Sequence, residues 1–133
     1  VEQVLNSVAG LKRLTELVPS PRNGLLFCVG TVHEMGEDTM AALEHFLERG
    51  KIFGAHFRNP RGTMPRGGYR EDFLDEGDLD MLEVIRLFHS YDYQGVLDPD
   101  HAVGIVGDGG GRLGFAWELG YMKALMAAVR SEQ

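Results

Sequence analysis

The spacing of apolar residues along the chain predicts four helices. Apolar side chains recur every three or four positions in residues 7–18, 37–49 and 79–89, so in each segment they share one helix face. A last helix is expected over about 112–130, after a run of glycines. Proline cannot continue a helix, so Pro19 marks the end of the first one.

Three short segments between these helices predict strands, at residues 25–29, 52–57 and 94–97. The first is a continuous apolar run, LLFCV, which is typical of a strand buried on both faces. Strands that alternate with helices are typical of parallel βαβ units with right-handed connections. The three strands should therefore lie side by side in an α/β fold, and their C-terminal ends should meet at one edge.

Side chains that can bind a metal stand at each of these strand ends. Cys28 lies at the end of the first strand and His56 at the end of the second, and Asp100 and His101 follow the third. A thiolate, an imidazole and a carboxylate can together hold a divalent transition metal. Taken singly, Cys28 could be a small core residue and His56 a packing residue. An acid next to an imidazole at a strand end rarely serves packing, and the common level of all three sites favours a metal centre.

Four other polar residues are less informative. His33 and Glu34 lie just beyond the first strand, where they could line a substrate pocket or belong to a solvated loop. His45 and His89 lie within predicted helices, where we expect them to face solvent or a helix seam.

A long polar loop extends from residue 59 to about 78, and loops of this length without regular structure are often functional. One arginine precedes it and three lie within it: Arg58, Arg61, Arg66 and Arg70. Arginine matches the geometry of a carboxylate, so the loop would suit an anionic substrate, and a charge-mixed surface loop is the alternative. The segment Gly107–Gly111 could offer backbone N–H groups to an anion, but it lacks a full phosphate-loop pattern and could be a flexible turn.

Composition narrows the classes of function. The length of 133 residues fits one domain, and 44% hydrophobic with 25% charged residues is ordinary for a soluble globular protein. The net charge of -7 without a basic block argues against a nucleic-acid partner. No apolar run approaches the roughly 18 residues of a membrane span. A single cysteine cannot form an internal disulfide, which suits a reducing compartment, and we expect the cytoplasm.

Several motifs occur in a characteristic order: LVPSPRNGLLFC at residues 17–28, AHFRN at 55–59, GDLDM at 77–81 and PDH at 99–101. They resemble the LVPSPxNGLxFC, VHxRN, GDVDM and PDH segments of the mannonate dehydratase family, whose members are metal-dependent (β/α)8 enzymes. The segment GYMKAL at 120–125 resembles the closing helix of the family. The resemblance covers nearly the whole chain.

This resemblance implies a reaction, a metal and a set of site residues. The reaction is the dehydration of D-mannonate to 2-keto-3-deoxy-D-gluconate, a lyase step of hexuronate breakdown. The divalent metal would be Mn²⁺ or Fe²⁺, with Mg²⁺ or Co²⁺ as alternatives, and its ligands here would be Cys28, His56 and Asp100. His101 would do acid/base work. The groups that contact the sugar acid would be Arg58, Asn59 and, from the same rim, His33.

The chain also departs from the family pattern. Asp98 stands where the family commonly has an arginine, and Leu74 or Asp75 where it often has a histidine. The second acid/base of the family, a tyrosine, falls near Phe115 or Trp117, and neither can transfer a proton. The fourth metal ligand, an upstream histidine, would lie before Val1.

The number of predicted strands is small for such an enzyme. A closed (β/α)8 barrel takes about 250 residues, and this chain offers three strands. We therefore expect residues 1–133 to form a single partial domain, the C-terminal portion of a TIM barrel. Its open sheet edges would need the remaining barrel or a homo-oligomer. By itself the chain is expected to show little or no dehydratase activity.

Two other functions stay open at this stage. A xylose-isomerase-like sugar isomerase or epimerase would also place metal ligands at strand ends, although normally with more carboxylates than here. A non-catalytic α/β domain could bind an anion at the glycine loop or serve in assembly. That last hypothesis predicts that Cys28, His56 and Asp100 do not converge.

Overall fold

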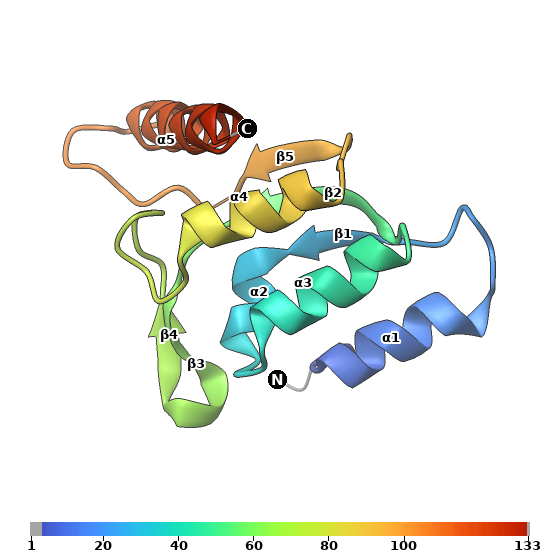
Figure 1. Cartoon of the computed structure of the whole chain (residues 1–133). Coiled ribbons are helices and arrows are strands. Elements are labelled where there is room, and N and C mark those ends of the chain that lie inside the picture. Colours follow the sequence, from blue (N-terminus) through green and yellow to red (C-terminus); the bar gives the residue numbers. More distant parts are fainter. Residues whose placement is uncertain (1–3, 133) are drawn as a thin grey trace.

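A three-stranded parallel sheet forms the centre of the fold (Figure 1). In the computed structural model, which describes residues 4–132, its strands are β1 (Leu25–Cys28), β2 (Ile52–Phe57) and β5 (Val96–Pro99). They lie in the order β1-β2-β5, which confirms the expected α/β alternation and parallel pairing. The third strand begins two residues later than expected, because Gln94 belongs to the preceding turn, where its amide donates to Asp92.

Helices connect the strands and pack mainly on one face of the sheet. They are α1 (Val8–Leu17), α2 (Val29–Glu34), α3 (Thr39–Glu48), α4 (Met81–Ser90) and α5 (Arg112–Ser131). In Figure 1, α3 and α4 lie in front of the strands and α5 lies beside β5. The four helices expected from the sequence are confirmed, with ends that differ by at most two residues. Among the described residues, no helix is both long and apolar enough to cross a membrane.

Side-chain caps explain where three of these helices begin. Ser7, Asp38 and Asp80 each accept a hydrogen bond from a backbone N–H in the first turn of the helix that follows, α1, α3 and α4 respectively. Such a cap satisfies one of the N–H groups that have no partner within the helix. The short helix α2 was not expected, because it follows β1 directly and has no apolar repeat of its own.

The hydrophobic core lies between the sheet and helices α3 and α4. Phe27, Phe46 and Phe57 are at most 1% exposed and pack together with Val84 and other apolar side chains. The opposite face of the sheet is open, and Leu26 is 61% exposed there. The expectation that the first strand is buried on both faces is therefore wrong for this chain, because its helices cover only the face that carries Leu25 and Phe27.

The long loop after β2 is more ordered than expected. It contains a β-hairpin made of β3 (Arg61–Thr63) and β4 (Gly68–Arg70), with a single 3-10 turn, η1 (Met64–Arg66), between them. Gly67 follows this turn at a φ of 103°, a conformation that glycine adopts without steric cost. The hairpin projects from the C-terminal end of the sheet in Figure 1.

The second half of this loop is held by one buried amide. Asn59 is 1% exposed, and its Nδ2 donates to the carbonyl oxygens of Leu74 at 2.7 Å and Leu79 at 2.9 Å. Its Oδ1 accepts from the backbone N–H of Leu79 at 2.9 Å. These bonds replace a regular hydrogen-bond ladder, so a segment without helix or strand still has a defined path.

Candidate metal centre

Three side chains of different chemistry meet at the C-terminal edge of the sheet. One potential ligand atom each of Cys28, His56 and Asp100 lies within 4.8 Å of the other two. The strand register explains this convergence, because Cys28 pairs with His56 and His56 pairs with Asp98, two residues before Asp100. The backbone N–H of Asp100 also donates to the carbonyl oxygen of Phe57 at 3.2 Å, which keeps the end of β5 against β2.

The donor set fits a divalent transition metal. Nδ1 of His56 lies 3.1 Å from Oδ2 of Asp100, and both side chains are roughly one quarter exposed, at 28% and 26%. Cys28 is partly buried. A soft sulfur, an imidazole nitrogen and a carboxylate oxygen are ligands that such metals accept together.

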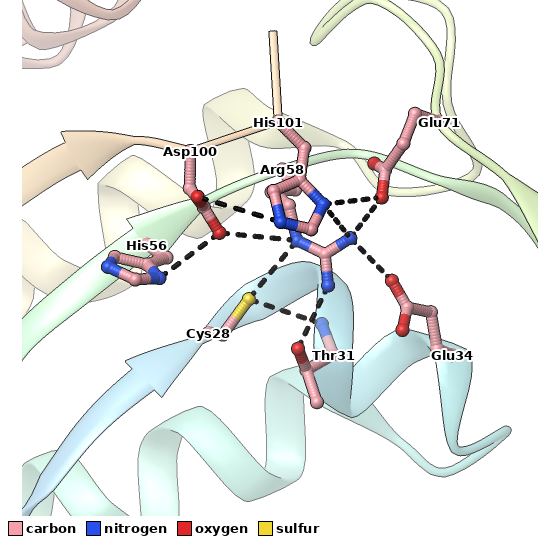
Figure 2. Close-up of polar contacts among 8 residues, drawn as sticks. All are labelled: Cys28, Thr31, Glu34, His56, Arg58, Glu71, Asp100 and His101. Atoms are coloured by element: carbon pink, nitrogen blue, oxygen red, sulfur yellow. Dashed lines mark hydrogen bonds and ion pairs between the residues drawn. The ribbon is translucent and has the colours of Figure 1, made fainter. Parts of the chain in front are cut away.

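A buried guanidinium lies directly against these ligands (Figure 2). The side chain of Arg58 is 4% exposed, and its Nε donates to Sγ of Cys28 at 3.3 Å. The same Nε lies 3.6 Å from Oδ2 of Asp100, and Nη2 donates to Oγ1 of Thr31 at 2.9 Å. Arg58 therefore contacts two of the three candidate ligands from the protein side of the cluster.

Two carboxylates balance the charge of this guanidinium. Oε1 of Glu34 lies 2.6 Å from Nη1 of Arg58 as an ion pair, and Oε1 of Glu71 accepts a hydrogen bond from the same nitrogen. Burial by itself would lower the pKa of Arg58, but its contacts with Cys28 and Glu34 raise the pKa above the usual value. The guanidinium thus stays charged, in contact with the sulfur of Cys28 and with the carboxylates of Glu34 and Glu71.

His101 lies at the rim of the same cluster. Its backbone has a φ of 49°, and its side chain is 58% exposed. Nδ1 lies 3.1 Å from Oε1 of Glu71, while Nε2 lies 3.9 Å from Oδ1 of Asp100. A non-glycine residue in this left-handed region is uncommon and is enriched at functional sites. The turn aims the imidazole back over Arg58, as Figure 2 shows.

A further carboxyl group lies buried behind the site. Glu118 of α5 is 2% exposed, and its Oε2 is buried without a hydrogen-bond partner among the described residues. Burial, followed by the negative charges of Asp100 and Glu71, raises the pKa of Glu118 to about 7. One turn earlier on the same helix face, Gly114 packs against Ala102, so α5 lies over the segment that follows His101.

The remaining residues predicted for substrate contact do not join the cluster. Asn59 is buried and fully used by the loop, as described above. His33 lies in α2, not in a solvated loop, and its Nε2 is 3.4 Å from Oδ2 of Asp78. Glu34, in contrast, is buried at the end of the same helix and joins the cluster through its ion pair with Arg58. His45 and His89 are partly exposed on α3 and α4, in line with the expectation.

The arginines of the loop and the glycine segment mostly have partners within the chain. Arg61 and Arg70 both pair with Asp72, at 3.4 Å and 3.1 Å. At the start of α5, Asp108 accepts hydrogen bonds from three backbone N–H groups, those of Arg112, Leu113 and Gly114. The chain's own carboxylate therefore occupies the place of the anion that the glycine segment was considered to bind.

The departures from the family pattern also have defined places. Trp117 stacks on Tyr121 at 5.2 Å between ring centroids and meets Phe73 edge-on at 5.0 Å, so it packs α5 against the loop. Phe115 is 41% exposed. Neither residue could supply the second acid/base. The convergence of Cys28, His56 and Asp100 goes against the non-catalytic hypothesis, which predicts that they stay apart.

Comparison with known proteins decides the family. A sequence profile described as "D-mannonate dehydratase (UxuA)" matches residues 1–133, the whole chain. The chain belongs to the D-mannonate dehydratase family. A mannonate dehydratase of Streptococcus equi subsp. zooepidemicus is 35% identical over 109 residues, which are 80% of this chain and 29% of that protein. Mannonate dehydratase 2 of Halalkalibacterium halodurans is 32% identical over 110 residues, 81% of this chain and 32% of the relative.

Solved structures agree with this membership of the D-mannonate dehydratase family. The crystal structure of mannonate dehydratase from Streptococcus suis superimposes with a TM-score of 0.77 at 31% identity, over 92% of this chain and 38% of that one. A xylose isomerase domain protein from Alicyclobacillus acidocaldarius gives a TM-score of 0.69 at 20% identity, over 93% and 44%, and shows a shared fold alone. The chain thus spans about a third of the length of the curated relatives.

Three residues in or behind the cluster were not identified from the sequence: Thr31, Glu71 and Glu118. Glu71 is one of several acids in a polar loop, and only the position of Arg58 distinguishes it from its neighbours. Glu118 lies on a helix, where an acid is ordinary, and only its burial separates it from a surface residue.

Proposed function

We propose that this chain carries the metal centre and one acid/base group of a dehydratase that converts D-mannonate to 2-keto-3-deoxy-D-gluconate. The observation that supports this most is the convergence of Cys28, His56 and Asp100 within 4.8 Å, in a member of the D-mannonate dehydratase family. The relatives named above are described as mannonate dehydratases. A sugar acid is the substrate class that this proposal requires.

Cys28, His56 and Asp100 would hold the metal, with Mn²⁺ or Fe²⁺ the first choice and Mg²⁺ or Co²⁺ as alternatives. When bound, such a cation acts as a Lewis acid that stabilises negative charge developing next to the substrate carboxylate. The protein side of the centre is set by Arg58, which fixes the positions of Sγ of Cys28 and the carboxylate of Asp100 before any substrate arrives. Because these ligands are already fixed by Arg58, metal binding would lose little side-chain entropy.

His101 is the residue that would move a proton in this reaction. Dehydration removes the proton from C2 and the hydroxyl group from C3, so one group must accept a proton and one must donate a proton to the leaving oxygen. An imidazole can do either near neutral pH. The exposed side chain of His101, at the rim of the ligand cluster, can reach a bound sugar acid. A second proton-transfer group is left without an assignment.

The other residues expected to contact substrate would support the site from within the protein. Arg58 is buried, so it contributes positive charge beneath the substrate and order among the ligands. Asn59 fixes the path of the loop that brings Glu71 to the site. His33 ties α2 to the same loop through Asp78, and the pKa of that carboxyl is lowered, first by its hydrogen bond from Gly62 and then by His33.

We further propose that the sheet is part of a (β/α)8 barrel that other strands complete. Both outer strands, β1 and β5, have one unpaired edge among the described residues, and Leu26 and Val96 expose apolar surface at 61% and 67%. A cavity of about 210 Å³ lies beside β1, lined by residues that include Leu11 and Met35. The remainder of a longer chain or another copy would cover these surfaces, in a compartment that keeps Cys28 reduced, such as the cytoplasm.

Metal binding gives the first test. After treatment with EDTA, the protein is titrated with Mn²⁺ by calorimetry, alongside the variants Cys28→Ser, His56→Ala and the control His45→Ala on α3. We expect one Mn²⁺ site per chain, with an affinity at least about tenfold weaker in the first two variants. Loss of a group that only orients a ligand already costs about this much affinity, so loss of the ligand itself should cost no less. The control should bind like the parent. Equal affinity in all four proteins would refute the metal centre.

The reaction is tested separately. The chain by itself, and a version extended upstream by the sequence that precedes it in its gene, are incubated with D-mannonate and Mn²⁺, and 2-keto acid is measured. We expect product with the extended protein only, and loss of product when it carries His101→Asn. Equal activity of the short chain would contradict the partial barrel, and inactivity of both would contradict the dehydratase.

A further inference from the structure

His101 contacts the rest of the site mainly through one ring nitrogen. Its side chain is 58% exposed, so packing leaves the imidazole largely free. Nδ1 lies 3.1 Å from Oε1 of Glu71, whereas Nε2 is 3.9 Å from the nearest carboxylate oxygen of Asp100, beyond hydrogen-bond distance. The direction in which Nε2 points therefore depends on what holds Nδ1.

Glu71 is itself held in place by a buried group. Its Oε1 accepts from Nη1 of Arg58, and Arg58 is anchored by Thr31 at 2.9 Å and by Cys28 at 3.3 Å. The side chain of Glu71 is 27% exposed, so one end of the carboxylate is fixed while the group stays at the rim. A chain of contacts thus connects β1, the loop after β4 and the turn after β5.

Two arrangements of the imidazole proton have to be compared. Nη1 of Arg58 lies 3.4 Å from Nδ1 of His101, so a bare Nδ1 could accept from the guanidinium. Its lone pair would then face the carboxylate oxygen of Glu71 at the shorter distance of 3.1 Å, which is repulsive. With the proton on Nδ1, the N–H donates to that carboxylate and forms the stronger, charge-assisted bond. The geometry favours the second arrangement.

We propose that Glu71 is a positioning residue for His101: its carboxylate accepts a hydrogen bond from Nδ1–H, which leaves Nε2 unprotonated and turned toward the ligand cluster. The inference rests on the proposed function, in which His101 exchanges a proton with the substrate. With the proton on Nδ1, neutral His101 is set to accept one at Nε2. The C2–H bond can then break with transfer of its proton to that nitrogen, and the electron pair of the bond stays on the substrate, delocalised into its carboxylate. The imidazolium that forms would be stabilised by the carboxylate of Glu71.

The test reads the proton on the ring directly and needs no turnover. Protein labelled with ¹⁵N on histidine is examined by two-bond ¹H–¹⁵N NMR at pH 8 in EDTA, and the His101 signals are assigned with His101→Asn. In the parent we expect the Nδ1–H form, which is the minor tautomer of a free histidine side chain. Glu71→Ala should shift His101 toward the Nε2–H form. Glu71→Gln should keep Nδ1–H, because the amide oxygen can still accept. Glu76→Gln, in the same loop, should leave the signals unchanged.

The outcomes separate this proposal from the proposed function. An Nε2–H form in the parent, or the same form in the parent and in Glu71→Ala, would overturn the role of Glu71. Mn²⁺ titration of the same variants is the second measurement, and affinity within a few-fold of the parent in Glu71→Ala shows that the ligand cluster is intact. In the catalytically active extended protein, Glu71→Ala should lower kcat about tenfold or more with little change in KM, and Glu71→Gln should recover part of it. If Mn²⁺ binds none of the proteins, the proposed function fails while the NMR result still decides for or against Glu71.

Discussion

The guanidinium of Arg58 and the carboxylate of Glu34 lie 2.6 Å apart in a largely buried position, at 4% and 12% exposure. Removing one member of such a pair leaves the other charge without a partner, which costs about 3–5 kcal/mol. We therefore expect Arg58→Met to lower the free energy of unfolding by roughly this amount in urea titrations with EDTA. The double variant Arg58→Met, Glu34→Leu should recover part of the loss.

A surface ion pair gives the matched control for Arg58. Arg49 and Glu48 lie 3.2 Å apart with side chains about half exposed, so Arg49→Ala should change stability little. If Arg58→Met destabilises the protein no more than Arg49→Ala, the buried guanidinium does not organise the site as described.

Substitution by alanine should have opposite effects on stability at two glycines, Gly77 and Gly120. A Cβ at Gly77 would overlap the main-chain oxygen and the side chain of Asn59, both of which are fixed, so Gly77→Ala should destabilise the chain by about 1–3 kcal/mol. Gly120 lies within α5 with nothing near its Cβ position, so Gly120→Ala should stabilise by about 0.5–1 kcal/mol. Thermal or urea unfolding measures both, and a destabilising effect at Gly120 with none at Gly77 would contradict the described packing.

The glycine-rich segment before α5 depends on one carboxylate. Asp108 accepts from the N–H groups of Arg112, Leu113 and Gly114, although the N-cap position itself is Gly111. Asp108→Ala should cost about 1 kcal/mol of stability and reduce the helical circular dichroism signal, whereas Asp108→Asn should cost less. Added phosphate should not restore the stability of Asp108→Ala if the segment is a cap and not an anion site.

The sequence allowed the strands and the convergence of Cys28, His56 and Asp100 to be predicted because both depend on short-range patterns. Apolar runs and helical repeats fall at fixed spacings, and Cys28, His56 and Asp100 meet once the strands are parallel and in register. The contacts of Arg58 depend on something else, namely which of several loop acids folds back over β2. The later part of that loop is held at Leu74 and Leu79 by the buried amide of Asn59, a residue that was expected to touch substrate.

The hairpin and the short helix after β1 escaped prediction for a related reason. A strand of three residues or a helix of six carries too few positions for a hydrophobic repeat, and tertiary contacts determine its conformation. Similarly, His33 and Glu34 differ little in sequence surroundings, yet only Glu34 reaches Arg58.

Glu118 should make stability depend on pH in a recognisable direction. Its pKa of about 7 in the folded chain lies above the usual 4.5, so the folded state holds a proton that the unfolded state releases between these values. Stability from this group is therefore fully present below about pH 4.5 and is lost as pH rises through about 7. In EDTA, the free energy of unfolding of the parent relative to Glu118→Gln should fall by about 2–3 kcal/mol between pH 5 and pH 8.

Glu132 provides a control for Glu118 with the opposite sign. Its pKa is lowered, first through the hydrogen bond from Arg86, so its contribution to stability is present above the usual carboxyl pKa and is lost as pH falls through the lowered value. The parent should therefore gain stability relative to Glu132→Gln as pH rises from strongly acidic values. Relative to Glu118→Gln, the parent should instead lose stability as pH rises through neutrality. Parallel pH curves for the parent and Glu118→Gln would mean that the carboxyl of Glu118 is not confined behind Asp100. Mn²⁺ added at pH 8 should reduce the difference in free energy of unfolding between the parent and Glu118→Gln. The reason is that a cation held by Asp100 offsets the negative charge that Glu118 faces.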